Sequence, residues 1–480
     1  MNSIDAGHAA PVADTPTGLT PISIEPVDYD LLCDPRYGIV KVLVTQPTSD
    51  DLPQALIGVL AHVTDSARLG TWQGDRIAFG SAFEDFDRAR AAAIGEAMER
   101  YCGNYIPRGL ERASHADLVR QGRDAIDPTS LILYAEQQYA TPGFPFVPFT
   151  RDLPVLWVEG QDMYTGATVM VPASQVYINY HIGALGHEPQ THFVMYSGIA
   201  AGRGRGDAER AALEELIERD ATMIWWLSGS PCQGIDLNAL PELSRLLESP
   251  NGTADVDYHV IRIPSLFAAP VIGALCHDRR NQTVSLGVAC RADPLAAARK
   301  ALIEAAQLRG FALGLLDPEG SVWTAMARGY LDPGVYMPYR ADRCYRQSFA
   351  ADYHDITDLG SQSQFYLDPS THHHVERILR PAQSIALADL PRINGDSRAG
   401  ILRQLHSHGF RAISVDVTTP DVALSGMRVV RVIVPGLYPN APAAFPFLGG
   451  RRLYQEPAAL GWLPDTVQPE QVVRAPLPHS

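Results

Sequence analysis

Three segments of the chain repeat one arrangement of acidic and basic residues. The acidic or amide members are spaced three apart, as Glu96 and Glu99, Glu215 and Glu218, and Glu304 and Gln307. An arginine follows one or two positions later, as Arg100, Arg219 and Arg309. Residues i and i+3 share one face of a helix. Each segment therefore predicts a helix that offers two oxygen ligands beside a cation.

Oxygen ligands that converge from several helices would suit a Mg²⁺ ion, which prefers carboxylates and substrate phosphates. Neighbouring arginines would complement phosphate oxygens. A protein without a P-loop lysine could hold ATP in this way. One such segment alone more often indicates a solvated helix face with ion pairs between successive turns. Three copies embedded among apolar residues, as before Trp225 and Trp226, favour the site.

Long helical patterns cover residues 86–105, 206–226, 293–316 and 396–409, and the first three contain the acidic segments. Asp87, Asp207 and Asp293 are the predicted N-caps of those three helices. Short β-branched stretches predict strands at 38–44, 155–158, 260–263, 282–288, 412–417 and 429–434. Strands interleaved with helices predict an α/β or an α+β fold, and periodicity alone does not separate the two.

Composition excludes several other functions. The 480 residues carry 39 Lys+Arg against 54 Asp+Glu, and the net charge of −15 argues against a nucleic-acid-binding face. Lys41 and Lys300 are the only lysines, and neither follows a glycine-rich loop of the P-loop or protein-kinase type. Six cysteines without a C-x-x-C pair indicate a reduced compartment and no zinc ribbon. The three histidines at 372–374 predict a surface loop rather than a metal site.

The ends of the chain carry weaker patterns. Residues 1–25 predict a flexible leader, without the basic and apolar regions of a signal peptide. The longest apolar run, 266–276, is too short to cross a bilayer, so we expect a cytoplasmic protein. A linker-like stretch begins at Gln455, and residues 456–480 predict an extended tail.

Five stretches stand in a fixed order along the chain, at Gly95–Tyr101, Ser197–Gly202, Glu215–Ala221, Ala301–Gln307 and Val432–Leu437. As a set they resemble the motifs of the YcaO superfamily, and the resemblance covers residues 28–480. Three local matches narrow it, at Leu32–Ile39, Val171–Tyr177 and Arg219–Trp226. These are similar to the stand-alone cyclodehydratase component, or D protein, of thiazole/oxazole-modified microcin (TOMM) pathways.

The resemblance implies a mixed α+β fold in which sheets and helices converge on an ATP/Mg²⁺ site within a single large domain. It divides the chain into the leader 1–25, an N-terminal region 26–75 and a YcaO domain 76–480. The implied activity is an ATP-dependent conversion of Cys, Ser or Thr residues of a ribosomal precursor peptide to azoline rings. Thioamidation or amidine formation is an alternative chemistry. A non-catalytic docking scaffold is an alternative of another class.

Residue by residue, the resemblance implies Mg²⁺ ligands at Glu96, Glu99, Glu215, Glu218 and Glu304. It implies ATP contacts at Glu99, Arg100, Ser197, Arg203, Asp207, Arg219, Gln307 and Arg309. Ala92 and Ala297 stand where the family often has serine. No catalytic residue is assigned, although Pro476, Pro478 and Ser480 of the tail are candidates. The tail ends in His479-Ser480 rather than in the alternating prolines of azoline-forming relatives.

The resemblance also implies partners. These are the precursor peptide, a ThiF-like or ocin-type protein that binds its leader, and a flavin dehydrogenase in the same complex. Neither a nucleic acid nor a membrane is expected. A pairing of like subunits is left open, as are the substrate peptide, its ring positions and the final product.

Overall fold

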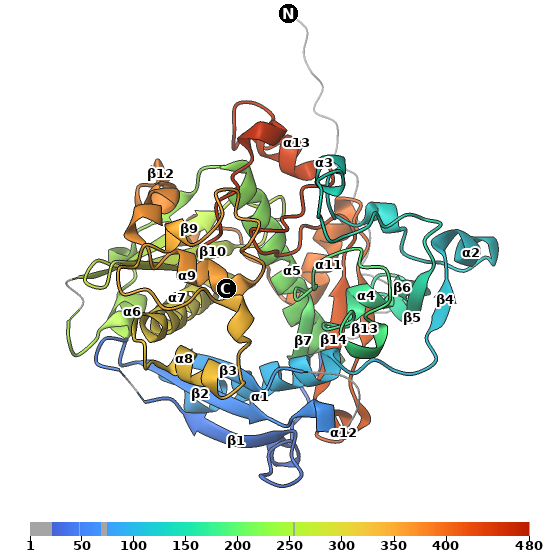
Figure 1. Ribbon diagram of the computed structural model, residues 1–480, viewed down its shortest axis with the longest axis horizontal. Coiled ribbons are helices and arrows are strands. Elements are labelled where there is room, and N and C mark those ends of the chain that lie inside the picture. Colours follow the sequence, from blue (N-terminus) through green and yellow to red (C-terminus); the bar gives the residue numbers. More distant parts are fainter. Residues whose placement is uncertain (1–21, 48, 69–73, 253–254, 480) are drawn as a thin grey trace, which may run out of the picture.

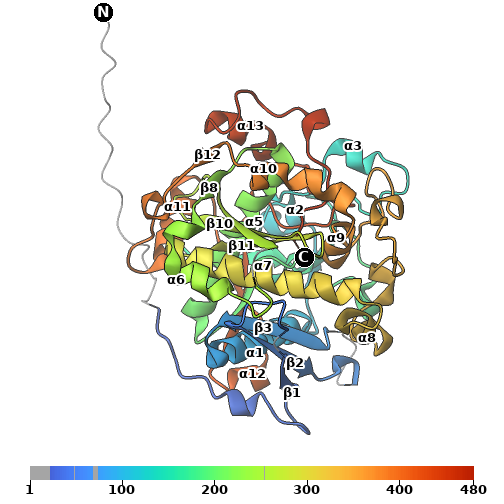
Figure 2. The same ribbon diagram turned by 90° about the vertical axis from the view of Figure 1, so that its left-hand side faces the viewer.

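The chain is built from three sheets joined by three long helices (Figure 1). The computed structural model describes residues 22–47, 49–68, 74–252 and 255–479. Figure 2 shows the three-stranded sheet and α1 forming the lower part of the molecule, with α7 crossing above them. Sheets mostly antiparallel and covered by helices confirm the mixed α+β prediction.

The strands pair almost entirely in the antiparallel sense, and β12 on β8 is the one parallel pair of named strands in the described residues. The first sheet, in the order β1-β2-β3, comprises Val40–Thr45, Leu56–Val63 and Ile77–Phe83. The second, β11-β10-β9-β8-β12, comprises Thr283–Cys290, Val271–Asp278, Val256–Ile263, Gln233–Ile235 and Gln383–Ser384. The third, β4-β5-β13-β14-β7, comprises Glu111–Ala113, Val155–Asp162, Ile413–Asp416, Arg428–Ile433 and Ile199–Gly202, and β6 (Thr168–Pro172) pairs with β5.

Each sheet carries one long helix. α1 (Phe86–Gly103) packs on β2 and β3, and α7 (Pro294–Leu316) packs on β10 and β11. α5 (Arg205–Ser228) packs on β7 and β14 and also contacts β11, so it joins the second and third sheets. The shorter helices are α2 (His115–Arg120), α3 (Glu136–Tyr139), α4 (Ala173–Val176), α6 (Pro241–Ser244), α8 (Ser321–Ala327), α9 (Leu359–Phe365), α10 (Glu376–Leu379), α11 (Ser397–Ser407), α12 (Pro420–Ala423) and α13 (Arg452–Ala459).

Small residues allow the helices to approach the sheets closely. A Cβ atom at Gly80 of β3 would lie 2.2 Å from the backbone nitrogen of Ala93 in α1. A Cβ atom at Gly287 of β11 would lie 2.1 Å from the carbonyl oxygen of Ala301 in α7. Both helices therefore lie in direct contact with the strand backbone. A glutamate or glutamine side chain on either helix can then reach past the strand beneath it to a neighbouring strand.

The helix predictions are confirmed to within a few residues, but two of the predicted N-caps are wrong. Asp85 caps α1, accepting from Arg88 N, because the helix begins at Phe86 and already contains Asp87. Gly204 precedes α5, and Asp207 lies in the first turn of that helix. Asp293 does cap α7, where it accepts a hydrogen bond from Ala296 N.

Two further corrections concern loops. The linker-like stretch at Gln455 lies inside α13, which includes Pro457. The histidines at 372–374 belong to a 3₁₀ helix, Pro369–Val375, rather than to an irregular loop. All six predicted strands are present, whereas β2, β3, β4, β6, β7, β8, β10 and β12 were not predicted. β10 is buried along most of its length, so it lacks the alternation that marks a half-buried strand.

The termini are only partly described. Residues 1–21 of the predicted leader and Ser480 lie outside the described residues, and Glu25 N–H donates to Arg203 O at 3.2 Å. The division into 1–25, 26–75 and 76–480 stays a prediction. In the described part of the chain, no helix is both long and apolar enough to cross a membrane.

Candidate nucleotide and metal site

The six echoing oxygen side chains of α1, α5 and α7 form a closed ring of contacts with three strand segments. Glu96 of α1 accepts from Phe79 N at 3.3 Å, and Gln307 of α7 accepts from the Ser81 hydroxyl at 2.7 Å, both on β3. Glu99 of α1 accepts from Ala201 N of β7 at 2.8 Å, and Glu215 of α5 accepts from Gly198 N, just before β7, at 3.0 Å.

The third side of the ring lies on β11. Glu218 of α5 accepts from Cys290 N at 3.0 Å, and Glu304 of α7 accepts from Val288 N at 3.2 Å. Each helix thus touches two strand segments, and each strand segment receives two helices. The three echoing segments of the sequence are therefore equivalent parts of one construction.

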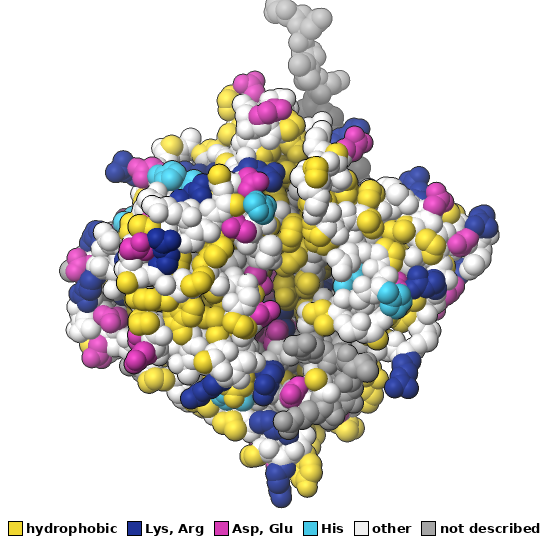
Figure 3. All heavy atoms as spheres, in the orientation of Figure 1, with side chains coloured by type: hydrophobic (Ala, Val, Ile, Leu, Met, Phe, Trp, Pro, Cys, Tyr) yellow, Lys and Arg dark blue, Asp and Glu magenta, His cyan; other side chains and the backbone are white. Residues whose placement is uncertain are grey.

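A cavity of about 460 Å³ opens inside this ring. Glu99, Glu215, Glu218 and Glu304 all line it, each with one oxygen held by the backbone N–H described above. The other oxygen of each carboxylate has no backbone donor among the described residues. Figure 3 shows acidic side chains gathered in a hollow near the middle of the molecule's face.

Cations surround the same cavity. Arg219 lies between two carboxylates, with Nε 3.8 Å from Glu215 Oε1 and Nη2 3.4 Å from Glu218 Oε1. Lys300 Nζ lies 3.0 Å from Glu304 Oε1. Arg100 pairs with Asp75 at 3.3 Å and stacks over the Tyr196 ring at 5.1 Å. Guanidinium and ammonium groups in this position can bind phosphate oxygens.

Burial sets the protonation of the carboxylates. It raises the pKa of Glu99 to about 8, with the nearby charges of Glu215 and Glu96 acting in the same direction. Burial also raises the pKa values of Glu96 and Glu218. Burial opposes ionisation of Glu304 as well, but Lys300 and Arg219 outweigh it and lower the pKa of that carboxyl group. A divalent cation would favour the ionised form of Glu96, Glu99 and Glu218, the three carboxyl groups whose pKa is raised.

The last described residues of the C-terminal tail lie against the site, and Figure 1 shows this end of the chain between α5 and α7. Trp226 Nε1 donates to Ala475 O at 2.8 Å, Tyr366 OH donates to Pro476 O at 2.6 Å, and Leu286 N donates to Pro478 O at 2.7 Å. These bonds fix the backbone of the last residues against α5, α9 and β11.

His479 is the tail residue that reaches the ring, and it is only 3% exposed. Its Nδ1 faces Leu286 O at 2.9 Å, so this nitrogen carries the proton, and its Nε2 accepts from Arg219 Nη1. Gln362 Nε2 donates to its carbonyl oxygen at 2.9 Å. Burial, followed by the positive charge of Arg219, lowers the pKa of His479 to about 4. The neutral imidazole is therefore an acceptor that holds Arg219.

The cavity lining includes seven of the site residues predicted from the sequence, namely Glu99, Arg100, Ser197, Glu215, Glu218, Arg219 and Glu304. Glu96 and Gln307 belong to the ring but not to the lining. Arg203 is exposed, and Asp207 pairs with Arg210 at 2.8 Å. Arg309 is buried in an ion pair with Asp278, 2.8 Å away, outside the cavity. Ala92 and Ala297 do not line the cavity either.

The sequence reasoning missed six polar residues of the lining, namely Asp75, Tyr196, Arg291, Lys300, Asp358 and Asn440. Lys300 could have been predicted from the sequence, because it lies four residues before Glu304 and therefore on the same helix face. The others come from segments without a repeated pattern. Only the fold places them together.

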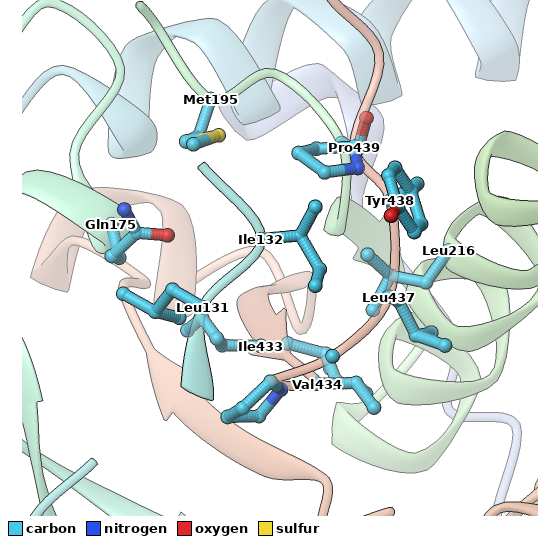
Figure 4. Close-up of a pocket in the computed structure, with 14 residues that line it drawn as sticks. Leu131, Ile132, Gln175, Met195, Leu216, Ile433, Val434, Leu437, Tyr438 and Pro439 are labelled. Atoms are coloured by element: carbon cyan, nitrogen blue, oxygen red, sulfur yellow. The ribbon is translucent and has the colours of Figure 1, made fainter. Parts of the chain in front are cut away.

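A smaller, mostly apolar pocket of about 50 Å³ adjoins the site and shares Ser197 with it. Figure 4 shows Ile132, Met195 and Leu437 around this pocket, with the Gln175 side chain at its edge. Gln175 is 6% exposed, and its Nε2 has no hydrogen-bond partner in the described residues. The pocket therefore places apolar surface and an unpaired amide beside the charged ring.

Comparison with known proteins agrees with this construction. The sequence profile of the family described as "YcaO cyclodehydratase, ATP- and Mg²⁺-binding" matches residues 83–438. A match over this much of the chain means that the protein belongs to the YcaO cyclodehydratase family.

The individual relatives and solved structures have low sequence identity to this chain. An uncharacterised protein of Methanothermobacter thermautotrophicus is 25% identical over 368 residues, which are 73% of this chain and 79% of that protein. A heterocyclase in complex with substrate and cofactor superposes with a TM-score of 0.69 at 20% identity, over 94% of this chain and 56% of the heterocyclase. This chain therefore spans little more than half of that structure.

A third relative is the structure of YcaO from Methanopyrus kandleri bound with AMPPCP and Mg²⁺. It has a TM-score of 0.54 at 20% identity, and the match covers 83% of this chain and 86% of that chain. The family is ATP- and Mg²⁺-binding, and the residues present here fit both. Carboxylates that each have one oxygen held by a backbone N–H and the other without a backbone donor suit Mg²⁺, and the flanking cations suit the phosphates of the nucleotide.

Proposed function

We propose that this protein is the ATP-dependent cyclodehydratase component that forms thiazoline or oxazoline rings in a ribosomally made precursor peptide. The observation that carries the proposal is the closed ring of six oxygen side chains around a cavity lined by cations. Membership of the YcaO cyclodehydratase family supports it. The similarity to a heterocyclase supports the fold in which such chemistry would take place.

In this proposal the carboxylates hold the metal. Glu99, Glu215, Glu218 and Glu304 each keep one oxygen on a backbone N–H, which fixes the side chain, and direct the other into the cavity. Glu96 supports the ring from its edge through Phe79. Mg²⁺–ATP, when bound, would supply the phosphoryl group that activates the amide oxygen and would neutralise the charge that develops there.

The cations orient the phosphates and are themselves held in place. Arg219 is fixed by two glutamates and by His479, and Lys300 is fixed by Glu304. Preorganised charges of this kind stabilise a phosphoryl-transfer transition state more effectively than mobile ones. The tail closes one side of the ring, so we assign Pro476, Pro478 and His479 to shaping and closing the site.

The proposed reaction balances without a redox step. The side-chain sulfur or oxygen of a Cys, Ser or Thr residue gives up its proton and adds to the preceding carbonyl carbon. The former amide oxygen takes the γ-phosphoryl group of ATP and leaves as phosphate, the amide nitrogen gives up its proton, and the C=N bond of the azoline closes. We propose that a ThiF-like or ocin-type protein presents the leader of the peptide, and that a flavin dehydrogenase acts on the azoline afterwards.

Mass spectrometry tests the proposal. The protein would be incubated with ATP, Mg²⁺, a Cys/Ser/Thr-containing precursor peptide and a leader-binding protein of the ThiF-like or ocin type. Loss of one water per modified residue is expected. Replacement of oxygen by sulfur would instead identify thioamidation, and an unchanged peptide would favour the docking scaffold.

A matched pair of substitutions in α1 controls this experiment. Glu99→Gln removes a cavity carboxylate, whereas Asp87→Asn changes an exposed acid on the same helix. The first should abolish ring formation and phosphate release, and the second should leave both intact. If Glu99→Gln retained full activity, the metal and nucleotide assignment would be wrong.

A further inference from the structure

A second group of metal-ligating side chains lies away from the nucleotide cavity, at one end of the β9–β10 strand pair. Asp257 and His259 are two residues apart on β9 and so point to the same face of the sheet. His277 of β10 lies directly opposite Asp257 in the antiparallel register and shares that face. One carboxylate oxygen and one nitrogen from each imidazole lie within 4.8 Å of one another.

The three side chains are prepared for a ligand. Among the described residues, no hydrogen bond reaches a ring nitrogen of His259 or His277. Arg279 Nη1 donates to Asp257 Oδ2 at 2.6 Å, which orients the carboxylate and leaves Oδ1 open. An outer hydrogen bond of this kind is the usual support of a metal-ligating carboxylate.

We propose that Asp257, His259 and His277 form a binding site for a divalent transition metal of the Zn²⁺ type. Two imidazoles and one carboxylate are ligands that Zn²⁺ accepts in a tetrahedral arrangement, with water in the fourth position. Zn–ligand distances of about 2.0–2.1 Å place tetrahedral ligands roughly 3.4 Å apart. The side chains therefore need to close by about 1.4 Å at most, which rotamer adjustment at a half-buried sheet face allows.

Three further histidines lie near this site, and the structure shows whether they belong to its ligands. The His372 ring centroid lies 6.3 Å from that of His277, but His372 Nε2 faces Tyr366 O at 3.2 Å. His372 does not belong to the group of ligand atoms that lie within 4.8 Å of one another, so we leave it out of the ligand set. The adjacent rings of His373 and His374, with centroids 3.9 Å apart, are the competing place for a soft metal. None of these residues lines the nucleotide cavity, so the inference is independent of the proposed function.

A Co²⁺ and Zn²⁺ titration of the full chain tests this site. Excess Mg²⁺ would be present throughout to occupy the glutamate ring, which prefers that hard cation. Co²⁺ should give the intense visible absorption of a four-coordinate ion at one equivalent per chain, and Zn²⁺ should displace it. Zn²⁺ affinity would be measured by competition with a chromophoric chelator.

Two sets of variants decide the outcome. The double variant His259→Ala/His277→Ala should lose the Co²⁺ spectrum, and Asp257→Asn, which keeps the side-chain shape, should weaken Zn²⁺ binding by at least about tenfold. The control His373→Ala/His374→Ala should bind as the parent does. Binding that survives the first two variants, or that is lost in the control, would overturn the proposal. Circular dichroism and ATP affinity would verify that each variant is folded.

Discussion

The substitution His479→Phe tests most sharply whether the C-terminal tail positions Arg219 for nucleotide binding or is only buried against it. The phenyl ring keeps the aromatic shape but removes both nitrogens. Leu286 O then loses the donor that lies 2.9 Å away, and Arg219 loses its acceptor. The backbone bonds of the tail to Tyr366 and Leu286 N are unchanged. The direct consequence is therefore confined to one carbonyl and one guanidinium group.

The magnitude follows from those two contacts. A hydrogen bond to a charged group contributes about 1.5–3 kcal/mol, and a buried carbonyl left without a donor costs about 1–3 kcal/mol. The free energy of unfolding should fall by roughly 2.5–6 kcal/mol, unless the tail detaches first and limits the loss. If Arg219 binds phosphate only while His479 holds it, affinity for ATP should fall by about tenfold to a hundredfold, at 1.4 kcal/mol per factor of ten.

Calorimetric titration with AMPPCP and Mg²⁺ measures that affinity. The matched control is Tyr366→Phe, which removes another buried hydrogen bond of the tail, to Pro476 O at 2.6 Å, without touching Arg219. Tyr366→Phe should cost stability but should leave nucleotide affinity within about twofold of the parent. Equal losses of affinity in both variants, or none in His479→Phe, would refute the positioning role.

Three other substitutions give distinct signatures. Because the pKa of Glu99 is raised from 4.5 to about 8, its ionisation removes stability as the pH rises through that interval. In Mg²⁺-free buffer the melting temperature of Glu99→Gln should therefore fall less than that of the parent between pH 4.5 and 8, and an identical pH profile would contradict the burial argument. Asp278→Asn breaks the buried ion pair with Arg309. Urea unfolding should show a loss of about 3 kcal/mol in the free energy of unfolding, with unchanged affinity for AMPPCP. Weakened AMPPCP binding would instead indicate that Arg309 contributes to the nucleotide site. Lys300→Met should weaken AMPPCP binding about tenfold, the loss of one charge-assisted contact, and full affinity would exclude Lys300 from the phosphate site.

The long helices could be predicted from the sequence, because the periodic pattern that indicates them lies within each helix segment. α1, α5 and α7 are long and periodic. Their pairs of oxygen-bearing side chains at i and i+3 can be recognised in the sequence without knowing what the helices pack against. β10 could not be predicted in the same way, because a strand buried along most of its length reads as an uninterrupted apolar run. β7 is equally obscure, since Ile199–Gly202 consists mostly of alanine and glycine.

The closure of the site is a long-range property that no window of sequence contains. Glu99 reaches a strand about a hundred residues away, and Gln307 reaches Ser81, more than two hundred residues away. His479 reaches Arg219, which lies 260 residues earlier in the chain. Arg309 shows the converse case, because its place in the echo predicts a phosphate ligand, whereas the fold pairs it with Asp278.

The central claim is that the glutamates of the three helices hold one Mg²⁺–nucleotide, and a single titration tests it directly. AMPPCP would be titrated calorimetrically, with and without Mg²⁺, into the parent and into Glu218→Gln, whose carboxylate is nearly buried between Arg219 and Cys290. The parent should bind one equivalent only with Mg²⁺, and Glu218→Gln should bind at least about a hundredfold more weakly. Metal-independent binding, or equal affinity in a folded Glu218→Gln protein, would contradict the account.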